Sequence, residues 1–314
     1  MSIDVSIIIT AYNIESYIAR AIHSALEQRG VSVEVIFVDD CSTDKTFSVA
    51  SAIQDPRLTC LRLPVNSGPG GARNAGFEKA AGKWIAVLDG DDAYEPERLA
   101  NCLSTANRTG ADVVVDNLRV IREQDGAQFP MFPSDFLRKT TLGLADFIAG
   151  NTAFFGSYSL GYLKPVFAAD FLRGHGIAYD PGIRIGEDYL ILCEALASGA
   201  VCAIEPSAGY LYTARAGSIS YRLAPADLDR MAACDRKFLS RHTLSPVAAQ
   251  AQKKRDFNIR EARAFTLLVD GLKRKDPLSA LTAFLSCPSA ARHLSGAVMV
   301  RMHKLIPSLS GKKS

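Results

Sequence analysis

The stretch Ile85-Ala86-Val87-Leu88-Asp89-Gly90-Asp91-Asp92-Ala93-Tyr94 decides how the rest of this chain is interpreted. Its four leading apolar residues are typical of the end of a buried strand, and three carboxylates follow within four positions. A carboxylate in a dry interior is unfavourable unless it is paired or bound to a metal ion. A strand that delivers Asp-x-Asp into a loop therefore favours a cation site with oxygen ligands, while a solvated acidic turn is the alternative.

The composition places the chain among soluble globular proteins. It has 314 residues, of which 48% are hydrophobic and 22% are charged, so one or two domains with a sizeable core are expected. The net charge of +3 is too small to favour a nucleic-acid-binding protein that depends on phosphate contacts. Seven cysteines without a CxxC pair indicate core residues in a reducing compartment, not a disulfide framework or a zinc site.

From the sequence we expect neither a targeting segment nor a membrane-spanning segment. The N-terminus lacks a basic region followed by a long apolar run, so we expect no signal peptide. No run approaches the roughly 18 apolar residues that a membrane span requires. The expected location is cytoplasmic, with any membrane contact peripheral, at the inner face.

Apolar runs and helical spacings alternate along the first half of the chain. This alternation predicts an α/β fold with a mostly parallel sheet flanked by helices. The predicted strands cover 5–10, 33–38, 58–63, 83–88 and 112–120, and the predicted helices cover 14–28, 45–53, 71–81 and 96–106.

Polar loops follow the first, second and fourth predicted strands. In parallel sheets of this kind, ligands bind at the carboxyl ends of the strands. We therefore expect Thr10-Ala11-Tyr12, Asp39-Asp40 and Asp89-Gly90-Asp91 to meet in a single site. For the pair Asp39-Asp40, helix capping is the alternative interpretation.

The second half of the chain is less regular. Two short strands are predicted at 201–204 and 209–213, and a helix is predicted from Glu187 to Ala197, with Glu187 and Asp188 in its first turn. A helix N-terminus favours carboxylates there for electrostatic reasons alone. From residue 225 onward the pattern is helical, over 225–241, 246–274, 277–285 and 290–304, and the last residues are basic. Such an end is either a solvated tail or a contact for an anionic membrane.

Several of these motifs occur together in a fixed order. They are the run from Val5 to Asn13, Val38-Asp39-Asp40 with Asp44, Asn66-x-Gly68 with Ala72-Arg73-Asn74-x-Gly76, Asp89-Gly90-Asp91-Asp92, and Gly186-Glu187-Asp188. Together they resemble family 2 glycosyltransferases of the GT-A fold. The resemblance covers residues 3 to about 220, and nothing beyond about residue 225 contributes to it. In its overall sequence, the chain is similar to bacterial exopolysaccharide glucosyltransferases of the succinoglycan type.

The resemblance implies an inverting transfer of a sugar from a nucleotide donor, usually a UDP-sugar, to a hydroxyl group. Thr10, Ala11 and Tyr12 would line the nucleotide pocket. Asp40 would accept a hydrogen bond from the uracil ring, with Asp39 orienting the loop beside it. Arg73 would approach the base or the diphosphate, and a surface salt bridge is its alternative role.

The same resemblance implies a divalent cation, Mg²⁺ or Mn²⁺. Asp91 would ligate it. Asp89 would be the second residue of the metal site, contacting a metal-bound water, or would contact the ribose. Gly90 between them would belong to the same substrate-binding loop. Departure of UDP leaves negative charge on the diphosphate, which a hard cation with oxygen ligands neutralises. Asp92 is expected either to assist the site or to cap the following helix.

An inverting transfer needs one general base to take the proton of the acceptor hydroxyl. By resemblance Asp188 is that base and Glu187 a supporting contact, and a charged first helical turn is the alternative. In a loop similar to the family's segment over the diphosphate, Thr213 stands where many members carry Arg or His. Arg215 is the nearest cation and is expected to take that role, with Ser218 and Ser220 as phosphate contacts.

These expectations define a domain plan and a set of partners. Residues 1–224 would form the GT-A domain, with a nucleotide-sugar half (1–120) and an acceptor half (121–224), and 225–314 a helical C-terminal region. The donor would be a UDP-sugar, by resemblance UDP-glucose, and the acceptor a glycan, by resemblance a lipid-linked oligosaccharide. The C-terminal helices would pack internally or pair with a second copy. A nucleotidyltransferase and a non-catalytic sugar-nucleotide-binding or glycan-binding module are the alternatives.

Overall fold

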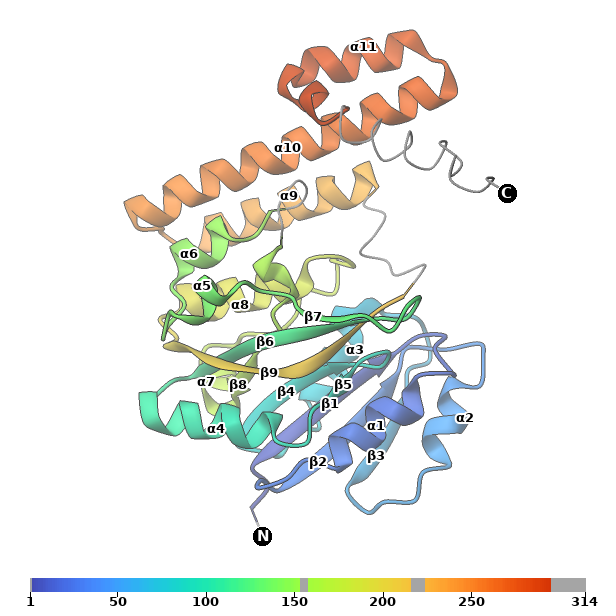
Figure 1. Cartoon of the computed structure of the whole chain (residues 1–314), viewed down its shortest axis with the longest axis vertical. Coiled ribbons are helices and arrows are strands. Elements are labelled where there is room, and N and C mark those ends of the chain that lie inside the picture. The colour runs from blue at the N-terminus through green and yellow to red at the C-terminus, as the bar shows by residue number, and fades with distance from the viewer. Residues whose placement is uncertain (1, 153–157, 216–223, 295–314) are drawn as a thin grey trace, which may run out of the picture.

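The computed structural model of the chain describes residues 2–152, 158–215 and 224–294 (Figure 1). Within these ranges nine strands form one sheet in the order β3-β2-β1-β4-β8-β6-β9-β5, with β7 paired to β6. The strands are β1 (Val5–Ala11), β2 (Val33–Asp39), β3 (Leu58–Arg62), β4 (Trp84–Asp89), β5 (Ala93–Tyr94), β6 (Val113–Arg122), β7 (Gln128–Pro130), β8 (Val166–Ala168) and β9 (Cys202–Ala214).

The helices alternate with the first strands and then dominate the end of the chain. The first half carries α1 (Ile18–Leu26), α2 (Thr46–Ser51), α3 (Gly68–Phe77) and α4 (Arg98–Thr109). The middle carries α5 (Ser134–Leu137), α6 (Leu144–Ala149), the 3₁₀ turn η1 (Leu160–Tyr162), α7 (Ala169–Gly174) and α8 (Glu187–Ala197). The end carries α9 (Pro225–Arg241), α10 (Pro246–Arg274), α11 (Pro277–Ser286) and the 3₁₀ turn η3 (Pro288–His293).

The parallel half of the sheet creates a turning point in the topology. β1 pairs in parallel with β2 on one side and with β4 on the other, and β2 pairs in parallel with β3. The chain moves outward from β1 to β3 and then crosses back to β4, so right-handed connections place α1 and α2 on one face and α3 on the opposite face. A crevice at the carboxyl ends of β1 and β4 follows from this reversal.

A close approach fixes α3 against the sheet. Gly76 lies so near β1 that an added Cβ would stand 2.4 Å from Ile8 Cγ2. Ile8 itself is fully buried. The sequence pattern placed the start of this helix near Gly71, whereas the structure starts it at Gly68. The mostly parallel α/β fold expected from the sequence is confirmed.

The far half of the sheet is mixed. β8 pairs antiparallel with β4 and with β6, and β6 pairs in parallel with β9. The prediction of two short strands at 201–204 and 209–213 was wrong, because β9 is one strand from Cys202 to Ala214. Its register against β6 shifts between Asp116 and Leu118, and this irregularity accommodates Pro206, which has no N–H for the ladder.

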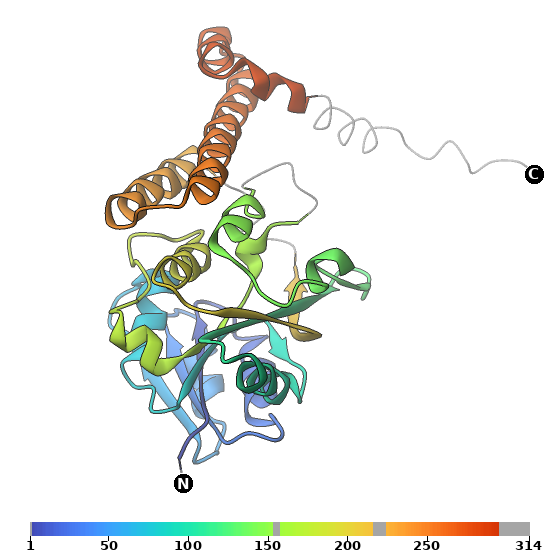
Figure 2. The same ribbon diagram turned by 90° about the vertical axis from the view of Figure 1, so that its left-hand side faces the viewer.

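The C-terminal helices pack onto the segment 121–224 and then extend away from it. α9 packs on α8, α10 on α6 and α9, and α11 on α10. Both views place α11 at the end of the molecule opposite the N-terminus (Figures 1 and 2). The predicted helix at 290–304 begins within η3, and the rest of it lies outside the described residues. In the described part of the chain, no helix combines the length and the apolar character that a membrane crossing requires.

Candidate active site

A cleft of about 470 Å³ opens at the carboxyl ends of β1 and β4. Eleven of the twelve side chains and loop positions predicted from the sequence line it: Thr10, Ala11, Tyr12, Asp40, Arg73, Asp89, Gly90, Asp91, Glu187, Asp188 and Arg215. Asp39 is fully buried, beside the cleft rather than in its described lining. The structure therefore gathers the three strand-end loops, the start of α8 and the end of β9 around one space.

Backbone contacts hold the three loops together. The Gly90 N–H donates to the Thr10 carbonyl at 3.1 Å, and the Asp40 N–H donates to the Ala11 carbonyl at 2.9 Å. Gly90 has no room for a side chain, because an added Cβ would lie 2.5 Å from Ile14 Cδ1 and 3.0 Å from the Thr10 carbonyl oxygen. Glycine between the two aspartates thus lets the loop after β4 rest directly on the loop after β1.

The two aspartates at the end of β2 have different roles. Asp40 Oδ1 accepts from the Ser67 N–H at 2.6 Å, and burial raises the pKa of the Asp40 carboxyl above its usual value. Asp39 Oδ2 accepts from the Ser42 N–H at 3.2 Å and lies 3.2 Å from Arg62 Nε. Asp40 therefore faces the cleft, while Asp39 fastens the loop that carries it.

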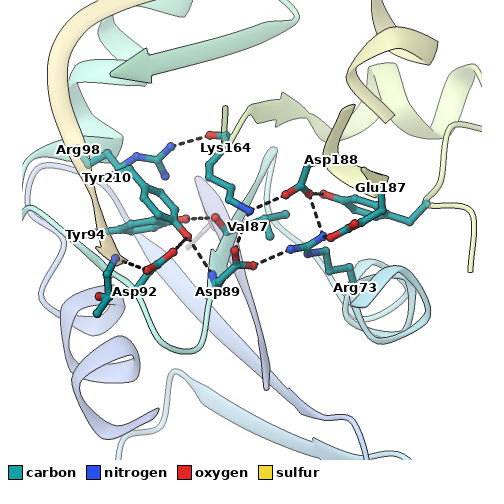
Figure 3. A network of polar contacts seen from close by, with 12 residues as sticks. Arg73, Val87, Asp89, Asp92, Tyr94, Arg98, Lys164, Glu187, Asp188 and Tyr210 are labelled. Carbon is teal, nitrogen blue, oxygen red and sulfur yellow. Dashed lines mark hydrogen bonds and ion pairs between the residues drawn. The ribbon is translucent and has the colours of Figure 1, made fainter. Parts of the chain in front are cut away.

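A buried ion-pair network joins the two sides of the cleft (Figure 3). Arg73 Nη1 donates to Asp188 Oδ1 and to Glu187 Oε1, each at 2.8 Å, and Arg73 Nη2 donates to Asp89 Oδ1 at 2.6 Å. Lys164 Nζ donates to Asp89 Oδ2 at 2.7 Å and to Asp188 Oδ2 at 2.5 Å. Two cations thus share three carboxylates, and both cations contact Asp89 and Asp188.

The network shifts the proton affinities of its members. Burial opposes ionisation of Asp89, yet Lys164 and Arg73 outweigh it and hold the pKa of that carboxyl below its usual range. Burial also opposes the charge on Lys164, but Asp188 and Asp89 raise its pKa well above the usual value. Burial and the neighbouring Asp188 raise the pKa of Glu187. Lys164 and Asp89 are therefore both held in their charged forms.

The Arg73 side chain is buried and does not extend into open space. It is only 2% exposed and lies over the Tyr179 ring, 5.1 Å from its centroid. It still lines the cleft, but its described contacts are with the carboxylates. The alternative of a salt bridge on the helix surface is wrong, because the ion pairs are buried.

Sequence reasoning missed Lys164. Its side chain is 7% exposed and lines the cleft. The available signal was a single lysine inside the apolar segment from Leu163 to Phe171, where an unpaired cation would be costly. That signal indicates a buried partner without saying which carboxylate it would be.

Asp92 does not cap the following helix, whose N-cap is Glu97; it lies at the edge of the cleft, and its carboxylate is buried in contacts with β9. Tyr210 Oη donates to its Oδ2 at 2.8 Å, and the Thr213 N–H donates to its Oδ1 at 2.7 Å. Burial, Asp91 and Asp89 together raise the pKa of Asp92 well above its usual value. The third acidic residue of the stretch therefore ties β9 to the loop after β4.

Asp91 is the residue of this stretch whose surroundings bear on the expected cation. Arg215 Nε donates to its Oδ2 at 2.8 Å, and its side chain is 23% exposed toward the cleft. Among residues 2–152, 158–215 and 224–294 no three His, Cys, Asp or Glu side chains are grouped as a metal site. Mg²⁺ and similar ions commonly take only one or two carboxylates and complete their shell with substrate phosphates and water. Asp91 fits such a cation, whereas both Asp89 oxygens already accept from Lys164 and Arg73.

The C-terminal helices reach the side of the cleft that carries Asp188. Met231 of α9 lines the cleft. Arg255 of α10 is 3% exposed, pairs with Asp235 at 2.7 Å, lies over the Tyr189 ring at 3.7 Å and donates to the Asn151 side chain. Asn151 and Tyr189 both line the cleft, so helices without any recognised motif support one wall of the site. The two expected phosphate contacts Ser218 and Ser220 lie outside the described residues.

Comparison with known proteins gives the family. The model described as Glycosyl transferase family 2 matches residues 6–169. The chain is 46% identical to succinoglycan biosynthesis protein ExoO of Rhizobium meliloti (strain 1021) over 303 residues, which cover 96% of this chain and 87% of that protein. It is 40% identical over 97 residues to UDP-Glc:alpha-D-GlcNAc-diphosphoundecaprenol beta-1,3-glucosyltransferase WfaP of Escherichia coli, covering 31% of this chain and 39% of that protein.

Solved structures share the architecture at low sequence identity. TarS residues 1–349 of S. aureus in complex with UDP-GlcNAc align with a TM-score of 0.66 at 19% identity, covering 91% of this chain and 92% of that one. The mannosyltransferase PcManGT of Pyrobaculum calidifontis, in complex with GDP-Man and Mn²⁺, aligns with a TM-score of 0.62 at 18% identity, covering 96% and 81%. These likenesses support the GT-A fold alone. The family match and the full-length relative together show that the chain belongs to glycosyltransferase family 2 and is a glycosyltransferase.

Proposed function

We propose that this enzyme moves a sugar from a UDP-sugar to a hydroxyl group of a glycan acceptor, with inversion at the anomeric carbon. The observation that carries this proposal is the shared cleft, in which Asp40 and Asp91 line one side and Asp188 lines the other. A nucleotide-binding side and a proton acceptor in one space are what a single-displacement transfer needs. Transfer with inversion needs no second carboxylate, unlike hydrolysis through paired acids.

The role proposed for each residue is carried over from the family resemblance, and the position of each residue at or beside the cleft supports it. Asp40 would accept a hydrogen bond from uracil, and Thr10, Ala11 and Tyr12 would surround the nucleoside. Asp188 would take the proton of the acceptor hydroxyl group. The hydroxyl oxygen would attack the anomeric carbon as the bond between that carbon and UDP breaks. Glu187 would contact the acceptor, and Arg215 would move from Asp91 toward the diphosphate. A divalent cation held by Asp91, Mg²⁺ or Mn²⁺, would neutralise the charge that UDP carries away.

The donor and acceptor are proposed from relatives. WfaP is named for glucose transfer from UDP-glucose to a diphosphoundecaprenol-linked sugar, and ExoO is named for succinoglycan biosynthesis. We therefore propose UDP-glucose as donor, a lipid-linked oligosaccharide as acceptor and exopolysaccharide synthesis as the setting. The Mn²⁺ bound in PcManGT supports a divalent cation.

A panel of UDP-sugars tests this proposal directly. UDP release would be measured for each donor with Mn²⁺, with Mg²⁺ and with a chelator. We expect turnover of one donor that requires the cation, and UDP-glucose to be that donor. Turnover of another UDP-sugar would replace only the sugar, whereas no turnover and no UDP binding would overturn the proposal and favour a non-catalytic module.

We also propose peripheral contact with an anionic membrane surface, through the outward face of α11. Leu278, Leu281 and Leu285 on this face are 73%, 53% and 67% exposed, while Ala280 and Ala283 on the other face are buried. The exposed run Lys273-Arg274-Lys275 precedes this helix. Apolar side chains beside a basic cluster favour the headgroup region of an anionic bilayer. The basic residues Arg301, His303, Lys304, Lys312 and Lys313 lie outside the described residues.

Vesicle sedimentation separates this contact from pairing of two copies. We expect binding to vesicles that contain phosphatidylglycerol, little binding to pure phosphatidylcholine vesicles, and loss of binding in Leu278→Ser/Leu285→Ser. Val247→Ser is the matched control, because Val247 is 67% exposed at the other end of α10. A dimer in solution that dissociates in the double variant, without vesicle binding in the parent chain, would assign the face to a second copy instead.

A further inference from the structure

Lys164 occupies a position that none of the roles above explains. Its ammonium contacts Asp89, on the nucleotide side of the cleft, and Asp188, on the acceptor side, at 2.7 and 2.5 Å. Arg73 makes the same connection from another direction, through Asp89 Oδ1 and Asp188 Oδ1. Each oxygen of Asp188 therefore has its own cation: Arg73 at Oδ1 and Lys164 at Oδ2.

The lysine is fixed by its backbone as well as by its ion pairs (Figure 3). Arg98 Nη2 donates to the Lys164 carbonyl at 2.7 Å, and Arg98 is itself held by Asp116 through Nε and Nη2 at 2.9 and 2.7 Å. Asp89 is fixed from its own side, because Tyr210 Oη accepts from the Asp89 N–H at 3.1 Å. The distance between Lys164 and Asp89 is thus set by the fold and not by two freely moving side chains.

A carboxylate that is held at only one oxygen can rotate about its Cβ–Cγ bond. Arg73 and Tyr179 both contact Asp188 Oδ1, so without Lys164 nothing described here would hold Oδ2. Each carboxylate oxygen has two lone pairs, so an Oδ2 that accepts from Lys164 can still take a proton from a hydroxyl group. Small errors in the placement of reacting groups slow the reaction strongly, since a displacement of about 1 Å can lower the rate roughly 100-fold.

We propose that Lys164 is a positioning residue that joins Asp89 to Asp188 and so holds the proton acceptor in a fixed orientation toward the donor sugar. This inference rests on the proposed function, because it needs Asp188 as the proton acceptor. Lys164 does not itself touch the reacting atoms in this assignment. Its effect must therefore disappear when Asp188 can no longer accept a proton.

A double-mutant cycle of Lys164→Met, Asp188→Asn and their combination tests this dependence. With the UDP-sugar that the parent enzyme turns over, we expect Lys164→Met to lower kcat about 100-fold. We expect it to change the dissociation constant of UDP less than about threefold, because Arg73 still holds Asp89. In the Asp188→Asn background, the same change should lower kcat no more than about threefold further.

Two additional variants guard against a trivial loss of structure. Lys164→Arg keeps the charge with a different shape and should preserve the fold if Lys164→Met does not, while again lowering kcat only when Asp188 is present. Lys139→Met is the matched control, because Lys139 pairs with Asp146 at 2.9 Å but is half exposed and outside the lining of the cleft. It should keep the parent kcat.

The outcomes separate the inference from the function on which it rests. A full additive loss in the Asp188→Asn background, or a loss of UDP affinity equal to the loss of kcat, would overturn the positioning role while the transferase stands. A parent enzyme that turns over no UDP-sugar would overturn the proposed function, and the positioning role with it.

Discussion

The two sides of the cleft are built in different ways. The proposed nucleotide side consists mainly of loops at the ends of β1, β2 and β4, and its predicted residues other than Arg215 fall within short motifs in the first 91 positions. The proposed acceptor side joins residues that are far apart in the sequence, from Lys164 and Asp188 to Met231 and Arg255. A parallel sheet brings the first group together by topology alone. The second group depends on buried ion pairs between elements, so the two sides should respond differently to mutation.

The largest expected effect tests the acceptor side alone. Asp188→Asn should lower transfer by about two to four orders of magnitude, since a general base usually contributes this much. The dissociation constant of UDP should stay near that of the parent enzyme, as measured by calorimetry. Glu194→Gln is the control, because Glu194 lies on the same helix but pairs with Arg241 and His242 outside the cleft. Parent-like transfer in Asp188→Asn would remove this residue from the chemistry.

The next effect tests the nucleotide side. Asp91→Asn should weaken UDP binding in Mn²⁺ by about 100-fold, because a cation at this place would lose its carboxylate ligand. Titrations with and without a chelator should then give nearly the same affinity. Asp125→Asn, in an exposed loop, should keep the cation dependence of the parent enzyme. Unchanged cation dependence in Asp91→Asn would exclude Asp91 as a ligand.

Gly90→Ala tests whether the nucleotide side depends on the contact between two loops. The added methyl group would meet Ile14 Cδ1 at 2.5 Å and the Thr10 carbonyl oxygen at 3.0 Å. Overpacking of this kind costs about 1–3 kcal/mol, which should appear as a lower Tm and as a roughly tenfold weaker affinity for UDP. Gly143→Ala, with nothing within 4 Å of its added Cβ, should leave both unchanged. Equal values for the two variants would show that the loops do not need this contact.

The smallest effect is a pH dependence of UDP binding through Asp40. Burial raises the pKa of this carboxyl, against hydrogen bonds from the Ser67 and Gly68 amides and the charge of Arg184. Asp40 therefore gains its proton at a higher pH than an exposed aspartate, and UDP affinity should decrease as pH falls through that range. Between about pH 7 and pH 5 we expect a three- to tenfold decrease, the scale of one hydrogen bond to a charged group. Asp40→Asn should bind UDP with a flat profile, and a profile equal to the parent's would assign the titration elsewhere.

The nucleotide side could be predicted from the sequence because its chemistry lies within short segments. The run from Ile85 to Asp91 gives the strand, the loop and the carboxylates together, and the order of the motifs gives the family. Gly90 could be identified from the sequence as part of the site. The need for glycine at this position could not, because it arises from the close approach of Ile14 and Thr10 in the neighbouring loop.

The contacts of the acceptor side could not be predicted from individual sequence segments, because they join residues that are far apart in the chain. Lys164 shows only as a charge within an apolar run, and its two partners lie 75 and 24 residues away. Arg73 was assigned to the nucleotide, yet its three ion pairs also extend to α8. The helical spacing of α9 and α10 was visible in the sequence. Periodicity cannot show, however, that Met231 lines the cleft or that Arg255 supports Asn151 in its wall.

The ion-pair network also has a consequence for the way a nucleotide arrives. Among the described residues that line the cleft, six carboxylates face four cationic side chains, and Lys164 and Arg73 are already engaged with carboxylates inside the network. The cleft therefore offers a free diphosphate little long-range attraction. A nucleotide that carries its own divalent cation avoids this difficulty, since the complex brings its neutralising charge along. Association should then depend only weakly on ionic strength and strongly on the concentration of the cation–nucleotide complex.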